Sequence, residues 1–345
     1  MAKIPAVSLD VWKDLYAEAM RYESIKPWNI LCEESFFGVQ DPASGELGYG
    51  CVLGEMGTFL ALAVYRGAEG FNIYQRLKND EIPEDESFAA QNCLMAQFAD
   101  REELEKADRD NIKKLGLRFR GVQAWPLFRS QLPGYFPWHL EEKEAVFLTC
   151  ALRCASDWVE RISSGSLNPD ERPGKTFTYL LKAGDEKPPR EFEVCWTDTP
   201  VYKPAPPQPL ALDERRLAKL MSKPPKRGGL WEADVYYLPA PIMDRDRPYF
   251  IRMVMVVDRA SCFVLPGGVV PPERLAHEAL ADALLGGVEQ LGCAPGEICV
   301  RDEELSALLE PIAKALGARL TVGDLPSIRR TKKEIDKMLM SRGRM

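Results

Sequence analysis

The order of apolar runs in the last third of the chain constrains its fold more than any other feature. Three strand-like runs, at residues 231–238, 249–257 and 262–265, follow one another with only short polar turns between them. Apolar positions with the 3.6-residue period of helices then alternate with two further short strand-like runs. Strands joined by short turns are typically antiparallel, whereas strands that alternate with helices are typically parallel. We therefore expect the element order β-β-β-α-β-α-β-α around one mixed sheet.

Start and stop signals place the helices and the remaining strands of this region. Pro272 opens one helix and Asp302 caps the next, and Gly292 and Gly317 end them. Residues 228–345 are therefore predicted to form an α/β domain. Its remaining elements are two short strands and a final helix, at residues 297–300, 319–322 and 326–339.

The first segment, residues 1–162, has the signals of a mixed α+β domain. It opens with an amphipathic helix that either Ser8 or Asp10 caps. Two apolar runs at residues 49–53 and 58–65 then meet across a glycine-bearing turn, which predicts a β-hairpin. The segment ends with a long amphipathic helix.

Residues 163–227 differ from the segments on either side because they are rich in proline and in turn-forming residues. Proline removes backbone donors and favours extended conformations, so this composition is typical of a semi-rigid connector. Two strand-like runs, at residues 176–181 and 192–196, interrupt it and predict a second hairpin. We therefore expect two domains joined by a proline-rich connector with a β-hairpin.

Length and composition restrict the class of protein. The chain has 345 residues, of which 46% are apolar and 28% are charged, as in ordinary globular proteins of about two domains. No stretch of about 18 consecutive apolar residues occurs, and the N-terminus lacks the apolar region of a signal peptide. These features predict a cytoplasmic protein without membrane contact.

Cysteine and histidine usage argues against a zinc site or a catalytic triad. The nine cysteines are scattered and there are only two histidines, whereas structural zinc sites need clustered Cys and His. Cys150 and Cys154 share one face of a predicted helix at a spacing of i, i+4. They form either half of a metal site or, as we favour, small apolar groups in a buried stripe.

The charge distribution limits the partners of the chain. The net charge of −7 argues against broad nucleic-acid binding, which needs a basic face. The end of the chain is an exception, because its last helix and tail are basic. This run is either a solvated helix face or an edge that contacts phosphates, so nucleic acid is an alternative partner. The basic residues are Arg329, Arg330, Lys332, Lys333, Lys337, Arg342 and Arg344.

Two other patterns have both a structural and a functional interpretation. The glycines at positions 48, 50, 54 and 57 have a spacing similar to that of a phosphate-binding loop, but no helix follows them directly. We therefore expect turn glycines. The aromatic residues between 125 and 138 predict a core or inter-domain surface, or alternatively a surface that stacks on bases.

Acidic residues stand at three informative positions of the C-terminal elements. The first strand contains Trp231-Glu-Ala-Asp234, and an Asp-Arg-Ala-Ser run follows the second strand. Together with the element order, these runs resemble ribonuclease H-like domains, in particular transposase and retroviral-type integrase cores. Such cores have one Asp on the first strand, a second after the fourth and a Glu on a later helix, which here correspond to Asp234, Asp302 and Glu334. The resemblance implies that Asp234 and Asp302 hold Mg2+ or Mn2+ for phosphodiester chemistry.

Each of these acids also has an ordinary structural explanation. Asp302 is placed to cap a helix, Glu334 is placed to pair with Arg330 or Lys337, and Asp234 suits a solvent-facing position on an edge strand. Two hypotheses follow. The domain is either catalytically silent, which we favour, or a metal-dependent nuclease or strand-transfer enzyme that uses Asp234, Asp302 and Glu334.

A second resemblance covers nearly the whole chain. The phrases Gly-Tyr135-Phe-Pro-Trp138, Trp231-Glu-Ala-Asp-Val-Tyr-Tyr-Leu-Pro-Ala-Pro241 and Val300-Arg-Asp-Glu-Glu-Leu resemble a bacterial two-domain family of unknown function. This resemblance implies a bacterial cytoplasmic origin and no particular activity. We therefore expect a binding or interaction protein without a cofactor, whose partner is another protein or a small ligand.

Overall fold

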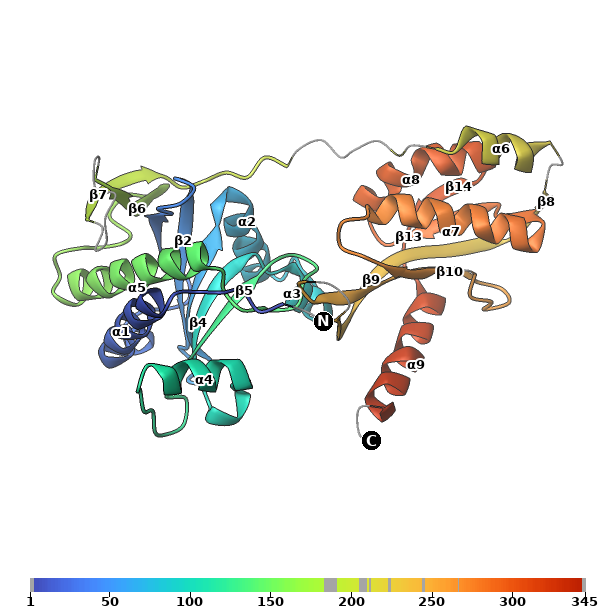
Figure 1. The fold of residues 1–345 in the computed structure, drawn as a ribbon. Helices are drawn as coiled ribbons and strands as arrows, with labels where there is room; N and C mark the ends of the chain where they lie inside the picture. Colours follow the sequence, from blue (N-terminus) through green and yellow to red (C-terminus); the bar gives the residue numbers. More distant parts are fainter. Residues whose placement is uncertain are drawn as a thin grey trace. The chain divides into compact units, whose positions relative to one another are not determined.

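The computed structural model describes residues 3–182, 191–204, 210, 212–222, 225–243, 246–265 and 267–342. Contacts divide the chain into two compact units (Figure 1). The first unit contains Met1–Pro204 and Met243–Pro248, and the second contains Ala205–Ile242 and Tyr249–Met345. Each unit has its own sheet and its own hydrophobic core.

The first unit is built on a seven-stranded sheet. Its strands are β1 (Phe36–Gln40), β2 (Leu47–Leu53), β3 (Leu60–Arg66), β4 (Cys93–Ala99), β5 (Trp125–Gln131), β6 (Lys175–Leu181) and β7 (Phe192–Asp198), in the order β5-β4-β3-β2-β1-β6-β7. All neighbouring pairs are antiparallel except β1 and β6, which run parallel. The predicted hairpin of β2 and β3 is present, with Gly54 and Gly57 at positive φ in its turn.

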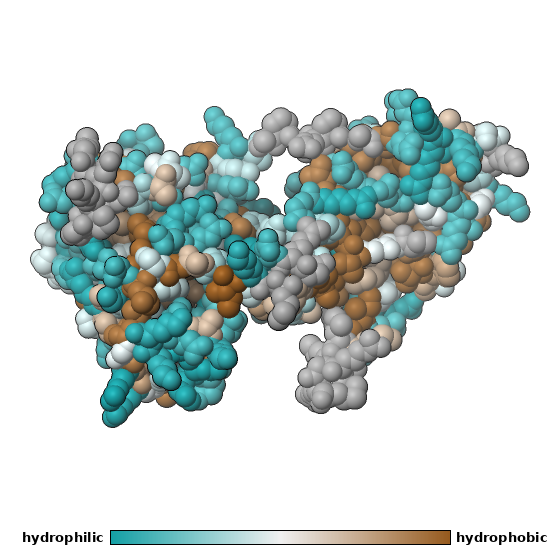
Figure 2. All heavy atoms as spheres, viewed as in Figure 1, coloured by the Kyte–Doolittle hydropathy of each residue, from teal (hydrophilic) through white to brown (hydrophobic). Residues whose placement is uncertain are grey.

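Helices cover both faces of this sheet, which explains why its central strands are almost continuously apolar. The long helices α1 (Leu9–Ile25) and α5 (Glu142–Ser163) pack against one face, and α2 (Gly67–Lys78) packs against the other. Ser8 caps α1, because its hydroxyl accepts a hydrogen bond from the amide of Val11. Two shorter helices, α3 (Glu84–Ala90) and α4 (Lys106–Lys114), complete the unit, and α4 forms a hydrophilic surface (Figure 2).

The segment expected to be a connector contributes to both units. The hairpin predicted within it is β6 and β7, and β6 pairs with β1 through Gly38 and Thr178, so the hairpin extends the first sheet. Helix α6 (Glu214–Met221) and the short strand β8 (Lys226–Arg227) belong to the second unit. The sequence predicts a connector here, whereas the structure places the hairpin in the first sheet. The reason is that proline content is a local signal, while the β1–β6 pairing joins residues that are far apart in the sequence.

The second unit contains a five-stranded mixed sheet, and the mixed α/β class predicted from the sequence is confirmed. The strand β10 is antiparallel to β9 and β11, while β13 is parallel to β9 and β14. The strands are β9 (Leu230–Ile242), β10 (Tyr249–Asp258), β11 (Gly268–Val270), β13 (Glu297–Val300) and β14 (Arg319–Val322), in the order β11-β10-β9-β13-β14. A separate short strand, β12 (Cys293–Ala294), pairs with β8.

Three helices sandwich this sheet. Helices α7 (Ala276–Leu291) and α8 (Glu303–Leu316) cover one face, and α9 (Pro326–Arg342) covers the other. Side chains alternate along β9 between the two layers. Trp231 and Ala233 therefore pack toward α7 and α8, whereas Tyr236 packs into the cluster beneath α9.

The third strand of this unit lies later in the chain than predicted. The sequence predicts it at residues 262–265, but the structure has β11 at Gly268–Val270, and Val264 makes only an isolated bridge to Val257. The reason is a tight turn after β10, in which Asp258 Oδ1 accepts hydrogen bonds from the amide and hydroxyl of Ser261. The apolar residues that follow complete this turn instead of starting a strand.

In the part of the chain that the structure describes, no helix is both long enough and apolar enough to cross a membrane.

A buried polar cluster attaches α4 to β5 in the first unit. Arg129 donates two hydrogen bonds to the carboxylate of Asp108, at 2.9 and 2.7 Å, and His139 Nε2 lies 3.1 Å from Glu105 Oε2. Burial and the charge of Arg129 lower the pKa of His139, although Asp108 and Glu105 act in the opposite direction. The imidazole is therefore held neutral in the folded protein at a pH where a free histidine would be protonated.

This lowered pKa predicts a loss of stability in mild acid. Below the ordinary histidine pKa of 6.5, the unfolded chain binds a proton at His139 more readily than the folded chain does. The unfolding midpoint of the first unit should therefore fall as the pH is lowered from about 7 to about 5.5, above the range where carboxylates titrate. The measurement is thermal unfolding across this range, with His139→Gln as the control. An equally steep decline in the variant would contradict the assignment to His139.

Candidate functional site

The structure brings two of the three predicted acids together in the second unit, where β13 ends beside β9. Asp234 lies on β9 and Asp302 follows β13, and these strands are parallel neighbours. Between the two carboxylates lies the guanidinium of Arg301. Its Nε is 3.4 Å from Asp234 Oδ1 and 3.2 Å from Asp302 Oδ2. The two acids therefore converge on a side-chain cation.

Both acids also have structural contacts. Asp302 is the N-cap of α8, because its Oδ1 accepts a hydrogen bond of 2.8 Å from the amide of Leu305. Asp234 is buried, with 8% of its surface exposed, and its Oδ1 accepts from the amide of Val235. The capping role considered for Asp302 is thus present. Asp234 lies on a central strand and not on an edge strand.

Glu334 has a different environment. It is exposed on α9, whereas the adjacent Ile335 packs against the core beneath that helix. Among the described residues, no three His, Cys, Asp or Glu side chains are grouped as ligands for a single metal ion. The structure therefore groups Asp234 with Asp302 and Arg301, and the part of the chain that it describes adds no third carboxylate ligand to them.

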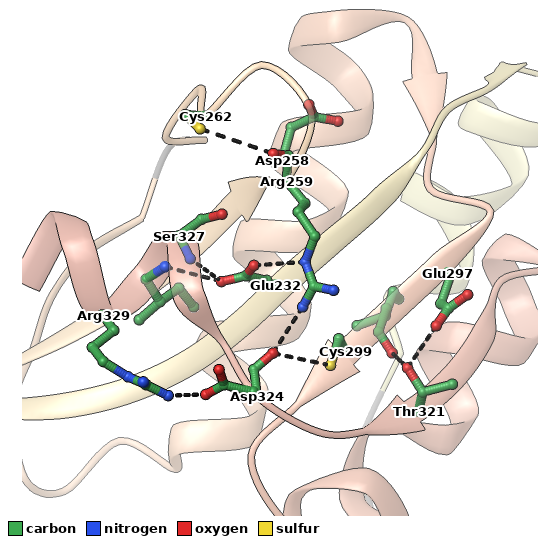
Figure 3. Close-up of polar contacts among 12 residues, drawn as sticks. Glu232, Asp258, Arg259, Cys262, Glu297, Cys299, Thr321, Asp324, Ser327 and Arg329 are labelled. Atoms are coloured by element: carbon green, nitrogen blue, oxygen red, sulfur yellow. Dashed lines mark hydrogen bonds and ion pairs between the residues drawn. The ribbon is translucent and has the colours of Figure 1, made fainter.

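The most deeply buried acid of this unit is Glu232, which the sequence analysis did not single out. It is fully buried on the face of β9 that lies under α9. Its Oε1 accepts a 2.8 Å hydrogen bond from Arg259 Nε, and its Oε2 accepts from the amides of Ser327 and Ile328, both at 2.9 Å (Figure 3). Arg259 in turn donates to the carbonyl of Asp324, which lies just before Leu325 and the start of α9 (Figure 3).

These contacts give both oxygens of the buried carboxylate hydrogen-bond donors and pair its charge with a cation. The first amides of a helix lack partners within the helix and carry partial positive charge, so an anion stabilises them. Arg259 supplies the compensating full charge, and its hydrogen bond to Glu232 raises the pKa of its guanidinium. Glu232 thereby fixes the start of α9 to the sheet. A sequence signal for this role exists. Glu232 stands two residues before Asp234, on the same face of a strand that is otherwise largely apolar.

The basic residues of α9 divide into two groups. Lys332 lies 5.2 Å above the ring of Tyr236, and Arg329 forms an ion pair with Asp324 (Figure 3). Arg330, Lys333 and Lys337 are exposed on the outer side of the helix. Part of the basic run therefore supports the packing of α9, and part of it forms a cationic surface.

The two cysteines for which half of a metal site was the alternative interpretation are buried in the first unit. Cys150 and Cys154 lie on the inner face of α5, and burial raises the pKa of the Cys154 thiol well above its usual value. A metal ligand must be a thiolate, so this environment favours packing over metal binding.

The glycines and aromatic residues considered above also have packing roles. Gly50 lies under the ring of Phe37, and a Cβ at this position would be only 2.4 Å from it. Close packing of strands, rather than phosphate binding, explains this glycine. Phe128 and Trp138 are buried, as expected for members of a core.

The fold and these contacts define a protein of two mixed α/β units, the second with an Asp–Arg–Asp cluster beside the carboxyl end of β13. Comparison with family models gives one match in each unit. Residues 12–179 match a domain of unknown function, DUF7309, and residues 216–336 match another, DUF6930. These matches support the expectation of two domains of unknown function. A search of curated proteins found no match to the chain.

The position of Glu232 predicts a large effect on stability. Glu232→Ala leaves two helix amides and the partly exposed Arg259 guanidinium without their acceptor, and a buried donor left unsatisfied costs about 1–3 kcal/mol. Glu232→Gln keeps one acceptor oxygen and should cost less. Hydrogen–deuterium exchange should show faster exchange at the start of α9, and denaturant unfolding should shift to lower concentration. Glu303→Gln, an exposed acid on α8, is the control, and a Glu232→Ala profile equal to that control would refute the anchoring role.

Proposed function

We propose that the chain is a binding or interaction protein whose second unit is a catalytically silent ribonuclease H-like domain. The strand arrangement supports this fold assignment. Domains of that class have a central first strand, with the second and third strands on one side and the fourth and fifth on the other, and an antiparallel second strand. The order β11-β10-β9-β13-β14 and the directions of these strands agree with that arrangement, as does the placement of helices on both faces.

The observation that carries the functional part of the proposal is the guanidinium of Arg301. A two-metal site needs carboxylates that are free to bind divalent ions, which then activate water and stabilise the leaving oxygen. Here an arginine is within ion-pair distance of both Asp234 and Asp302. A guanidinium neutralises the acids but supplies neither Lewis acidity nor an activated water, because its pKa is too high for it to lose a proton.

The rival function is metal-dependent nuclease or strand-transfer chemistry by Asp234, Asp302 and Glu334, with Mg2+ or Mn2+. One observation favours it, namely that Asp302 follows the carboxyl end of β13, where α/β sheets bind ligands, and that Asp234 of the neighbouring parallel strand β9 lies close to it. The exposed position of Glu334 and the salt bridges of Arg301 favour the silent domain.

The same proposal includes the cellular compartment, the origin and the partner of the protein. All nine cysteines are free thiols, which agrees with a reducing compartment such as the cytoplasm. A bacterial origin rests on the resemblance of the sequence to the two-domain family of unknown function. The exposed cations of α9 are the part of this unit best suited to an acidic partner, such as a nucleic acid.

Removal of Arg301 tests the proposal directly. Arg301→Ala removes the guanidinium that lies between the two carboxylates, and the variant should gain weak, saturable Mn2+ binding that the wild-type protein lacks. The double variant Arg301→Ala/Asp234→Asn should lose that binding again. Electron paramagnetic resonance of free Mn2+ measures the binding, and Arg319→Ala, which removes an exposed arginine paired with Glu297, is the matched control.

Metal binding and DNA cleavage by the wild-type protein would contradict the proposal of a silent domain. Wild-type protein that binds Mn2+ through Asp234 and cleaves single- or double-stranded DNA in its presence would establish the rival function. Loss of cleavage in Asp302→Asn and Glu334→Gln would then confirm the three acids as its catalytic residues.

A further inference from the structure

The first unit contains a polar cleft beside the start of α2. A cavity of about 490 Å³ and an adjoining one of about 240 Å³ share Arg66, Gly67 and Leu132 in their walls. The larger volume lies within the range of about 300–1,000 Å³ that is usual for small-molecule sites. All of the lining residues belong to the first unit, including Arg247 from the segment Met243–Pro248.

Two arginines and one carboxylate form the floor of this cleft around a fully buried serine. Arg66 Nη2 donates to Ser130 Oγ at 2.7 Å and lies 3.2 Å from Glu144 Oε1. Ser130 Oγ in turn donates to Glu144 Oε1 at 2.7 Å, and Arg247 Nη2 donates to the Ser130 carbonyl at 2.6 Å. Around Ser130 two positive charges therefore face one negative charge, and the smaller cavity is also lined by Asp41 and by the ion pair of Glu141 with Lys143.

Three further features give the floor an excess of hydrogen-bond donors. The Nε atoms of Arg66 and Arg247 have no hydrogen-bond partner among the described residues. Burial lowers the pKa of Arg247 and the nearby Arg66 acts in the same direction, whereas Glu144 and Glu141 act in the opposite direction. Helix α2 also begins here without a side-chain cap, and its residues Gly67, Ala68 and Glu69 line the cleft. Amides at a helix start and guanidinium groups both favour an anion.

The mouth of the cleft has the opposite charge. Glu46 and Glu69 are both exposed and both line the larger cavity. Glu46 Oε2 lies 4.0 Å from the position that a Cβ would take at Gly67, so this carboxylate stands directly beside the helix start. Asn92 also lines the larger cavity, but its side-chain oxygen is buried, so the two carboxylates are the acceptors at the mouth. Acceptors at the mouth attract a cation and disfavour a ligand with two negative charges, such as phosphate.

We propose that this cleft binds a small zwitterion, and specifically a free α-amino acid. Its carboxylate meets Arg66, Arg247 and the first amides of α2, and its ammonium group meets Glu46 and Glu69. The adjacency of Glu46 to the helix start matches the short distance between the two charged groups of an α-amino acid. The site is separate from the acids of the second unit, so the outcome of its test leaves the proposal about Arg301 unaffected.

Binding to the full chain tests this inference. The twenty common amino acids are screened by thermal shift and then by titration calorimetry, beside inorganic phosphate, N-acetylated amino acids and amino-acid amides. At least one free amino acid should bind saturably, while its N-acetyl and amide derivatives, each of which lacks one charge, should bind at least tenfold more weakly. Binding of phosphate but of no amino acid would refute the ligand class, and binding of none of these probes would refute the site.

Variants locate the binding within the cleft. Arg66→Gln should abolish it, but Arg66 also supports Ser130 and the Cys93 carbonyl, so a variant at the mouth is needed as well. Glu69→Gln leaves the floor intact and should weaken binding of the free amino acid roughly two- to fivefold, the scale of an exposed ion pair. Arg76→Gln, an exposed residue of the same helix that pairs with Glu81, is the matched control and should bind normally. Equal affinities of the Glu69→Gln and Arg76→Gln variants would show that the ammonium group is not recognised at the mouth.

Discussion

The second unit depends on one interaction, the placement of the fully buried Glu232 carboxylate against the start of α9. A charge with no solvent around it is tolerated only when it is paired and its lone pairs are satisfied. Here a guanidinium and two helix amides satisfy it from three segments of the chain, so β9, the turn after β10 and α9 are positioned together. Apolar packing beneath α9 is non-directional by comparison, and it does not determine where along the sheet the helix begins.

Arginine has a related role at three places in the structure. Arg259 compensates Glu232, Arg301 lies between Asp234 and Asp302, and Arg66 and Arg247 surround Ser130. Guanidinium groups suit these positions because they are always charged and present several donors in a fixed plane. The difference lies in the balance of charge. In the first two clusters the carboxylates equal or outnumber the cations, whereas at the floor of the cleft the cations are in excess.

The sequence was sufficient to predict elements whose signals are local. The cap at Ser8, the hairpin of β2 and β3, and the helices that end at Gly292 and Gly317 all follow from periodicity and from turn or capping residues. The predicted position of the third strand of the second unit, residues 262–265, was wrong. An Asx-type turn at Asp258 uses residues that have strand propensity, and β11 begins only at Gly268.

The sites were harder to predict than the elements, because their residues come together only in the folded chain. Asp234 and Asp302 could be selected from their places in the strand order, but the cation between them could not. Nothing in the local sequence distinguishes Arg301, Arg66 or Arg247 from other arginines. Their importance follows from β9–β13 pairing in one unit and from the meeting of β3, β5 and a distant loop in the other.

The parallel pairing of β1 with β6 has a consequence for how the chain is made. The two strands approach so closely that a Cβ at Gly38 would lie 2.6 Å from Thr178 Oγ1, and β6 follows β1 only after the whole of the intervening sheet and α5. During synthesis, therefore, β1 emerges early and keeps an unpaired edge until Lys175–Leu181 has left the ribosome. An unpaired edge offers backbone donors and acceptors to any other nascent chain. In the first unit, β1 therefore gains its second neighbour only when β6, one of the last two strands of the sheet, has been made.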